Sequence, residues 1–240
     1  VTVVAMESTG VYWSPVYEVL ERMGFEVHLV NPRATRQVSG RKSDVLDCQW
    51  LWQLMSYGLL KGAFRPAQAV CELRSYVRQR ARLVQDQSRS IQHMQKALTE
   101  MNVQLANVLS SVTGKTGLLI LRAIVAGERD GTILAQHRDN RVKADEQTIA
   151  RSLQGTWHEE HVFALSQALQ RYDFCTVQIS ACEVRIESCV AQLSLTTDAE
   201  PRVAKARSWT GRITTVLRQM LGVDLTAIPS IGIETALIVA

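Results

Sequence analysis

Three carboxylates near the start of the chain are the residues best suited to chemistry. Asp44 and Asp47 stand three positions apart at the start of a predicted helix, and Glu7 ends a short apolar run. Positions i and i+3 share one face of a helix, so both aspartates can point at one spot. Mg²⁺ and Mn²⁺ prefer carboxylate oxygens, so Glu7, Asp44 and Asp47 form a candidate metal site. A simpler alternative stays open, because Ser43 can cap this helix and acidic residues stabilise any helical first turn.

The segment around Glu7 predicts a strand, a helix and a second strand. Residues 1–6 are apolar and rich in β-branched side chains, residues 15–23 place apolar side chains at helical spacing, and residues 25–30 are typical of another strand. Such a βαβ unit has parallel strands, and functional groups gather beyond their carboxyl ends. Glu7 lies at such an end, and the chain leaving the second strand leads to the two aspartates.

Four basic residues lie between the second strand and the helix that carries the aspartates. They are Arg33, Arg36, Arg41 and Lys42. Cations beside carboxylates suit a metal-dependent enzyme acting on phosphates, because metal ions can flank an in-line displacement while basic side chains contact backbone phosphates.

Five motifs spread over nearly the whole chain carry a resemblance to a known family. They are Met6-Glu7-Ser8-Thr9-Gly10-Val11-Tyr12-Trp13, the pair Gly24-Phe25-Glu26-Val27 and Val30-Asn31-Pro32, Lys42-Ser43-Asp44-Val45-Leu46-Asp47, Val112-Thr113-Gly114-Lys115-Thr116-Gly117, and Asp224-Leu225-Thr226-Ala227-Ile228-Pro229-Ser230-Ile231-Gly232. Together they resemble the transposases of the insertion sequence 110 family, which include the related Piv-type DNA invertases.

The resemblance implies a catalytic domain similar to the RuvC junction resolvase, with a ribonuclease H-like fold and an Asp-Glu-Asp-Asp metal site. Glu7, Asp44 and Asp47 match the last three of these acids. The first acid is expected on a strand before Val1, and a nucleophilic serine is expected beyond Ala240. The chain is therefore expected to be incomplete for catalysis and to bind Mg²⁺ or Mn²⁺ weakly.

The resemblance also implies partners. Full-length relatives would cut and rejoin DNA by two-metal phosphoryl transfer, and in part of the family a structured non-coding RNA from the element would guide them. DNA is thus the expected partner, with structured RNA as a further one.

The expected fold class is α/β followed by mostly α. Residues 1–69 are interpreted as a partial ribonuclease H-like (RuvC-like) domain, 70–195 as a helical coiled-coil region, 196–212 as a basic linker, and 213–240 as the start of a C-terminal domain with a helix-hairpin-helix-like motif. In that motif Ser230 stands where the family more often has glycine, which tolerates positive φ better.

A heptad pattern predicts a long helix in the second region. Arg80 and Gln87 interrupt its companion positions, so a partner helix is expected to pack best against the C-terminal half. The pairing is interpreted as an antiparallel or intermolecular coiled coil, and a homo-oligomer is expected. The apolar positions of this heptad pattern recur every seventh residue at Val70, Val77, Val84, Ile91, Leu98 and Leu105.

A second heptad pattern contains three of the five cysteines. Cys175, Cys182 and Cys189 recur every seven residues and alternate with Ile179 and Ile186 along one seam. This spacing matches no common zinc motif and favours cysteine as a small core residue over metal or redox chemistry. An odd number of cysteines also argues against a secreted disulfide scaffold.

A row of arginines lies along one face of the first heptad helix. Arg74, Arg78, Arg82 and Arg89 fall within about a quarter turn of one another, at roughly 100° per residue. By sequence alone the row is either a solvated face or a surface for phosphates, and with the resemblance nucleic-acid contact is favoured.

Composition agrees with a protein that contacts nucleic acid. The formal net charge is +4, with basic residues clustered along the chain. No apolar run has the length of a membrane span and no opening segment resembles a signal peptide, so a cytoplasmic protein without membrane contact is expected. Gly114-Lys115-Thr116 does not form a nucleotide-binding loop, since Leu109 occupies the position of the required first glycine.

The sequence therefore predicts a transposase or recombinase. A non-catalytic helical remnant that binds nucleic acid or dimerises is the alternative, and a junction-resolving nuclease of the same fold is a weaker one.

Overall fold

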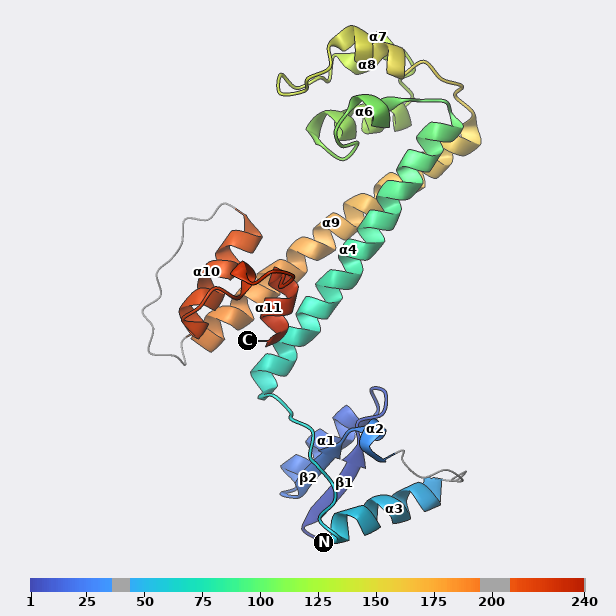
Figure 1. Ribbon diagram of the computed structural model, residues 1–240. Coiled ribbons are helices and arrows are strands. Elements are labelled where there is room, and N and C mark those ends of the chain that lie inside the picture. Colours follow the sequence, from blue (N-terminus) through green and yellow to red (C-terminus); the bar gives the residue numbers. More distant parts are fainter. Residues whose placement is uncertain (36–43, 195–207, 240) are drawn as a thin grey trace. The chain divides into compact units, whose positions relative to one another are not determined.

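A computed structural model describes residues 1–35, 44–194 and 208–239 (Figure 1). The chain divides into two compact units, residues 1–67 and 68–240.

The first unit contains a two-stranded parallel sheet. Strand β1 (Val3–Glu7), helix α1 (Trp13–Arg22) and strand β2 (Glu26–Val30) are followed by the short helix α2 (Pro32–Thr35) and helix α3 (Asp44–Ser56). The strands pair with Val3 opposite Glu26 and Glu7 opposite Val30. The predicted βαβ unit with parallel strands is confirmed, and Glu7 lies at its carboxyl end.

The sheet of this unit is thinly covered. Among the described residues of the unit, Leu29 and Val30 are the only buried apolar side chains, whereas Trp52 and Phe64 are largely exposed. Gly62 forms an antiparallel bridge to Val30 and so extends the sheet slightly. Two strands are too few to identify a ribonuclease H-like fold, which stays a prediction.

The second unit is built on two long antiparallel helices, α4 (Gln68–Glu100) and α9 (Glu159–Ser194), which lie side by side in Figure 1. Their contacts run in opposite directions along the two helices. Near the end of α4, Glu100 lies 3.5 Å from His161, and further back Gln87 donates a 2.8 Å hydrogen bond to Thr176. The first heptad helix therefore has its partner within the chain, in the antiparallel arrangement.

One expectation about the first heptad seam is wrong. Helix α4 ends at Glu100, because Asn102 adopts a left-handed φ of 56° and turns the chain, so Leu105 belongs to a separate short helix, α5 (Leu105–Val108). The expectation that a partner helix packs best against the C-terminal half stays a prediction. Met94, Ala97 and Leu98 of that half are buried, whereas Leu83 and Val84, between Arg80 and Gln87, are half-buried. Arg80 and Gln87 both bond to side chains of α9.

Three further helices pack with α5 at one end of the long pair: α6 (Lys115–Val125), α7 (Gly131–Ala135) and α8 (Glu146–Ser152). They share a core with Met94, Leu98 and Leu165. Gly117 has a packing role here, because a Cβ atom at this position would overlap the Val112 carbonyl group.

The C-terminal elements pack against α4 and α9 away from this end. They are α10 (Trp209–Leu221), the short 3₁₀ helix η1 (Leu225–Ala227) and α11 (Ile233–Val239). The predicted linker is corrected at its end, since residues 209–212 are already helical and Ser208 caps them by accepting a 3.2 Å hydrogen bond from the Gly211 N–H. The rest of the linker lies mainly outside the described residues. The elements share a second core, formed by Leu73, Val77, Ile186, Cys189, Val190, Trp209, Ile213, Leu217, Ala236 and Leu237.

The cysteines of the second heptad pattern are core residues, as predicted. Cys175 and Cys189 are buried and Cys182 is half-buried, and all are free thiols. Burial raises the pKa of each of these thiols, which keeps them protonated and unreactive.

Among the described residues, no helix is long and apolar enough to cross a membrane.

Candidate metal site and nucleic-acid interface

Glu7 is held by hydroxyl groups at the end of β1. The Thr35 hydroxyl lies 2.5 Å from Glu7 Oε1, and the Thr9 hydroxyl donates a 3.3 Å hydrogen bond to Oε2. Thr35 is only 5% exposed, and its oxygen also lies 3.0 Å from the carbonyl oxygen of Pro32. A hydroxyl has one proton, and the carboxylate at the shorter distance is the stronger acceptor. Thr35 therefore orients Glu7, a role that sequence spacing did not reveal.

The two aspartates lie where the helix prediction placed them. Asp44 and Asp47 form the first turn of α3 and are exposed. In the part of the chain that the structure describes, no three His, Cys, Asp or Glu side chains are close enough to share a metal ion. As they stand, Glu7, Asp44 and Asp47 do not fit a common ion, and stabilisation of the first turn explains the aspartates equally well.

The four basic residues that lie between β2 and α3 in the sequence are only partly described. Arg33 lies on α2, two residues before Thr35, and its side chain is exposed without an ion pair to any described residue. Its backbone N–H donates a 3.0 Å hydrogen bond to Asn31 Oδ1. Arg36, Arg41 and Lys42 lie outside the described residues, as does Ser43.

The arginine row on α4 is mainly open to solvent. Arg78, Arg82 and Arg89 are exposed, whereas Arg74 is half-buried and has a contact of its own. Arg82 bonds to Gln79 at 2.8 Å and Arg89 to Asp86 at 2.9 Å, both on the same helix and both exposed. Exposed pairs of this kind contribute little and exchange readily for other partners. Three of the four arginines can therefore meet phosphates.

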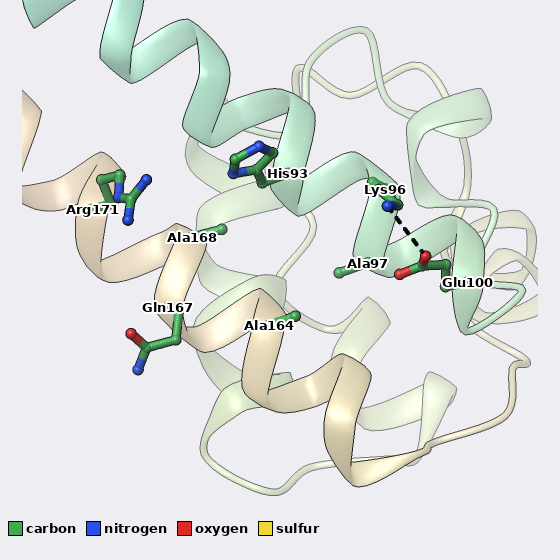
Figure 2. A pocket seen from close by; sticks show the side chains of 8 residues that line it. All are labelled: His93, Lys96, Ala97, Glu100, Ala164, Gln167, Ala168 and Arg171. Atoms are coloured by element: carbon green, nitrogen blue, oxygen red, sulfur yellow. Dashed lines mark ion pairs between the residues drawn. The ribbon is translucent and has the colours of Figure 1, made fainter.

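A groove between α4 and α9, which the sequence did not predict, borders this row. Its first hollow has a volume of about 350 Å³. Figure 2 shows the side chains that line it, among them His93, Lys96 and Glu100 of α4 and Gln167 and Arg171 of α9. A second hollow of about 400 Å³ continues it. His93 and Arg171 line both hollows, and Arg89 belongs to both the row and the groove. The second hollow is lined by Leu83, Asp86, Arg89, His93, Arg171, Phe174 and Cys175.

Comparison with known proteins adds one positive finding. Residues 1–103 match the family model of the DEDD transposases of the IS110 type, whose description is "Transposase". A search of the curated proteins and a search of the solved structures each gave no match. The matched segment contains the three carboxylates, all of α4 and its arginine row.

Proposed function

Since residues 1–103 are a transposase domain of the IS110 family, we propose that the protein takes part in DNA transposition by cutting and rejoining DNA strands. The family match carries this proposal. The parallel sheet, with Glu7 at its carboxyl end, supports it as the position where functional groups of such sheets gather.

The proposed reaction is metal-dependent, with Mg²⁺ or Mn²⁺ as the ion. The family pattern of carboxylates supports this part, and their present geometry does not, because the three side chains do not form one group. Glu7 is the anchored member, since Thr35 fixes one of its oxygens while Asp44 and Asp47 stay exposed.

The proposed nucleic-acid surface of the second unit is the arginine row of α4, and Arg33 is proposed as a separate phosphate contact in the first unit. Three guanidinium groups of the row are exposed on one face of the helix and can neutralise backbone phosphates. DNA is the partner that the family suggests, and we propose structured RNA as a guide on the same basic surface. Arg36, Arg41 and Lys42, which lie outside the described residues, are proposed as further phosphate contacts on the basis of the sequence alone.

Self-association is part of the proposal in a revised form. The apolar seam of α4 is occupied by α9 of the same chain, so it is not free for a second copy. Val177 and Val184 lie exposed on α9 and offer a different helical face for a homo-oligomer.

A second candidate function is non-catalytic binding of nucleic acid. It is favoured by the separation of the three carboxylates, which leaves the arginine row as the more complete functional feature.

One experiment separates the two functions. The DNA element that encodes the chain is placed on a donor plasmid in cells, and new DNA junctions are amplified for the parent, Glu7→Gln and Asp47→Asn. The enzyme proposal expects junctions from the parent and their loss in both variants. The matched control is Glu26→Gln, an exposed carboxylate at the opposite end of the sheet, which should keep activity.

Binding is measured on the purified variants in parallel. Changing Arg74, Arg78, Arg82 and Arg89 to Gln should weaken binding of DNA and lower the salt slope by about 0.7 to 0.9 for each phosphate that is no longer neutralised. Junctions that persist without Glu7 and Asp47 would refute the catalytic role. Binding that depends on the row, with no junctions from any variant, would favour the binding function.

A further inference from the structure

We propose that the groove between α4 and α9 binds a single-stranded segment of nucleic acid, with Arg171 on its backbone phosphate and Phe174 under one of its bases. The groove is defined by the two hollows that share His93 and Arg171. Its role rests on the nucleic-acid partner proposed above and specifies which form of nucleic acid the surface takes.

The charge of the groove favours a polyanion. Asp86 and Glu100 are its acidic residues, and each is paired with a cation of its own helix: Arg89 at 2.9 Å and Lys96 at 3.6 Å. Arg171 on the opposite helix is exposed and has no ion pair to any described residue, so its guanidinium group can bind an anion. The exposed Arg82 of the row adds further positive charge along α4.

The shape of the groove permits close approach. Alanines from both helices, Ala97, Ala164 and Ala168, line the first hollow, so no bulky side chain fills it (Figure 2). In the same figure His93 and Arg171 stand on the two helices that form its walls. A backbone phosphate can therefore lie between two groups that donate hydrogen bonds from opposite sides.

Phe174 gives the groove its preference for single strands. Phe174 is 61% exposed although it lines the second hollow, so it is poorly placed for a core role. Arg171 and Phe174 are three positions apart on one helix and are therefore neighbours on its surface. An aromatic ring next to cations is the usual platform for a stacked base, and a duplex, whose bases are already stacked, cannot offer one.

The chain offers matched controls on the same helix. Phe163 is 67% exposed and lies on α9 outside the groove, in a hollow with Trp157 and Arg129. Arg185 is likewise exposed on α9 and lines neither hollow of the groove. Phe174→Ala is thus compared with Phe163→Ala, and Arg171→Gln with Arg185→Gln.

The test measures binding of the 240-residue chain to fluorescent oligothymidylate and oligouridylate of about 16 nucleotides, and to a duplex of mixed sequence. Phe174→Ala should weaken single-strand binding roughly 10-fold, Phe174→Trp should retain it, and duplex affinity should change by less than about 2-fold. Arg171→Gln should lower the salt slope for single strands by about 0.7. Tighter binding of one oligonucleotide would assign the groove to DNA or to RNA, and either result supports the proposal.

Several results would overturn it. The groove would have no specific role if Phe163→Ala weakened binding as much as Phe174→Ala, or if an acidic peptide of equal charge displaced the oligonucleotide equally well. If Phe174→Ala had no effect while the arginine-row variant still showed weaker duplex binding, the groove proposal would fail and the proposed function would stand. If the parent bound no nucleic acid, both would fail.

Discussion

Replacing Arg80 by alanine should release helices α10 and α11 from the long helix pair without unfolding the pair itself. Arg80 bonds to Glu183 of α9 at 2.9 Å and to Glu234 of α11 at 3.0 Å. Its guanidinium group also stacks on the ring of Trp209 in α10, 4.0 Å from the centroid. One side chain thus joins four helices.

The magnitude follows from the exposure of the partners. Glu183 is 22% exposed, so its hydrogen bonds to Arg80 are worth about 1.5 kcal/mol, at the low end for charged groups. Glu234 is 42% exposed, and its pair contributes about 0.5 kcal/mol. The stacking on Trp209 adds about 0.5 to 1 kcal/mol. Arg80→Ala should therefore lower the free energy that holds α10 and α11 against the long helix pair by about 2 to 3 kcal/mol.

Hydrogen exchange read by mass spectrometry can locate this change. Amides of residues 209–221 and 233–239 should exchange roughly 30- to 150-fold faster, since each 1.36 kcal/mol is tenfold, while residues 91–98 keep their protection. The control is Arg82→Ala on the same helix, whose side chain is exposed and bonds to Gln79 of its own helix. Equal loss of protection in all of these segments would refute a local attachment role, and so would no change at all.

Three further outcomes are expected. Ser230→Gly should raise the free energy of unfolding by about 0.5 to 1 kcal/mol in urea titrations, because Ser230 has a φ of 71°. Asn102→Gly should raise the free energy of unfolding by less, because asparagine tolerates a positive φ. Gly117→Ala should lower the free energy of unfolding by about 2 to 3 kcal/mol, because the added methyl group would overlap the backbone of the preceding turn. Its control is Gly232→Ala, where the methyl group meets open space and the free energy of unfolding should change by less than about 1 kcal/mol. Calorimetric titration with Mg²⁺ should give little heat, since the carboxylates are not grouped, and any heat should shrink in Asp44→Ala; tight binding that this change leaves intact would contradict the metal site.

Local patterns in the sequence predicted the elements well. The β-branched run before Glu7 and the heptad spacing of α4 and α9 are short-range signals, and the corresponding strand and helices are present. The end of α4 was missed because the apolar period continues to Leu105 while Asn102 turns the chain within it. Periodicity records which side chains are buried, and residues on either side of a turn can share one core.

The functional surfaces were harder to predict because they depend on partners distant in sequence. In the sequence, Arg80 is interpreted as an interruption of the apolar seam, because the heptad pattern does not show that Glu183 and Glu234 form ion pairs with it. The spacing of Asp44 and Asp47 places them on one helical face, but it does not determine where α3 directs that face relative to Glu7.

The extent of the family match gives the groove experiment a second use. The match ends at residue 103, just after α4, so the arginine row lies inside it while Arg171 and Phe174 lie outside. Weaker binding on changing the row therefore tests a surface within the segment that matches the transposase family. Weaker binding on changing Phe174 tests a surface that exists only because α9 packs against α4. If both contribute to one bound strand, their effects on binding should be coupled, and the double variant should lose less affinity than the two single variants predict together.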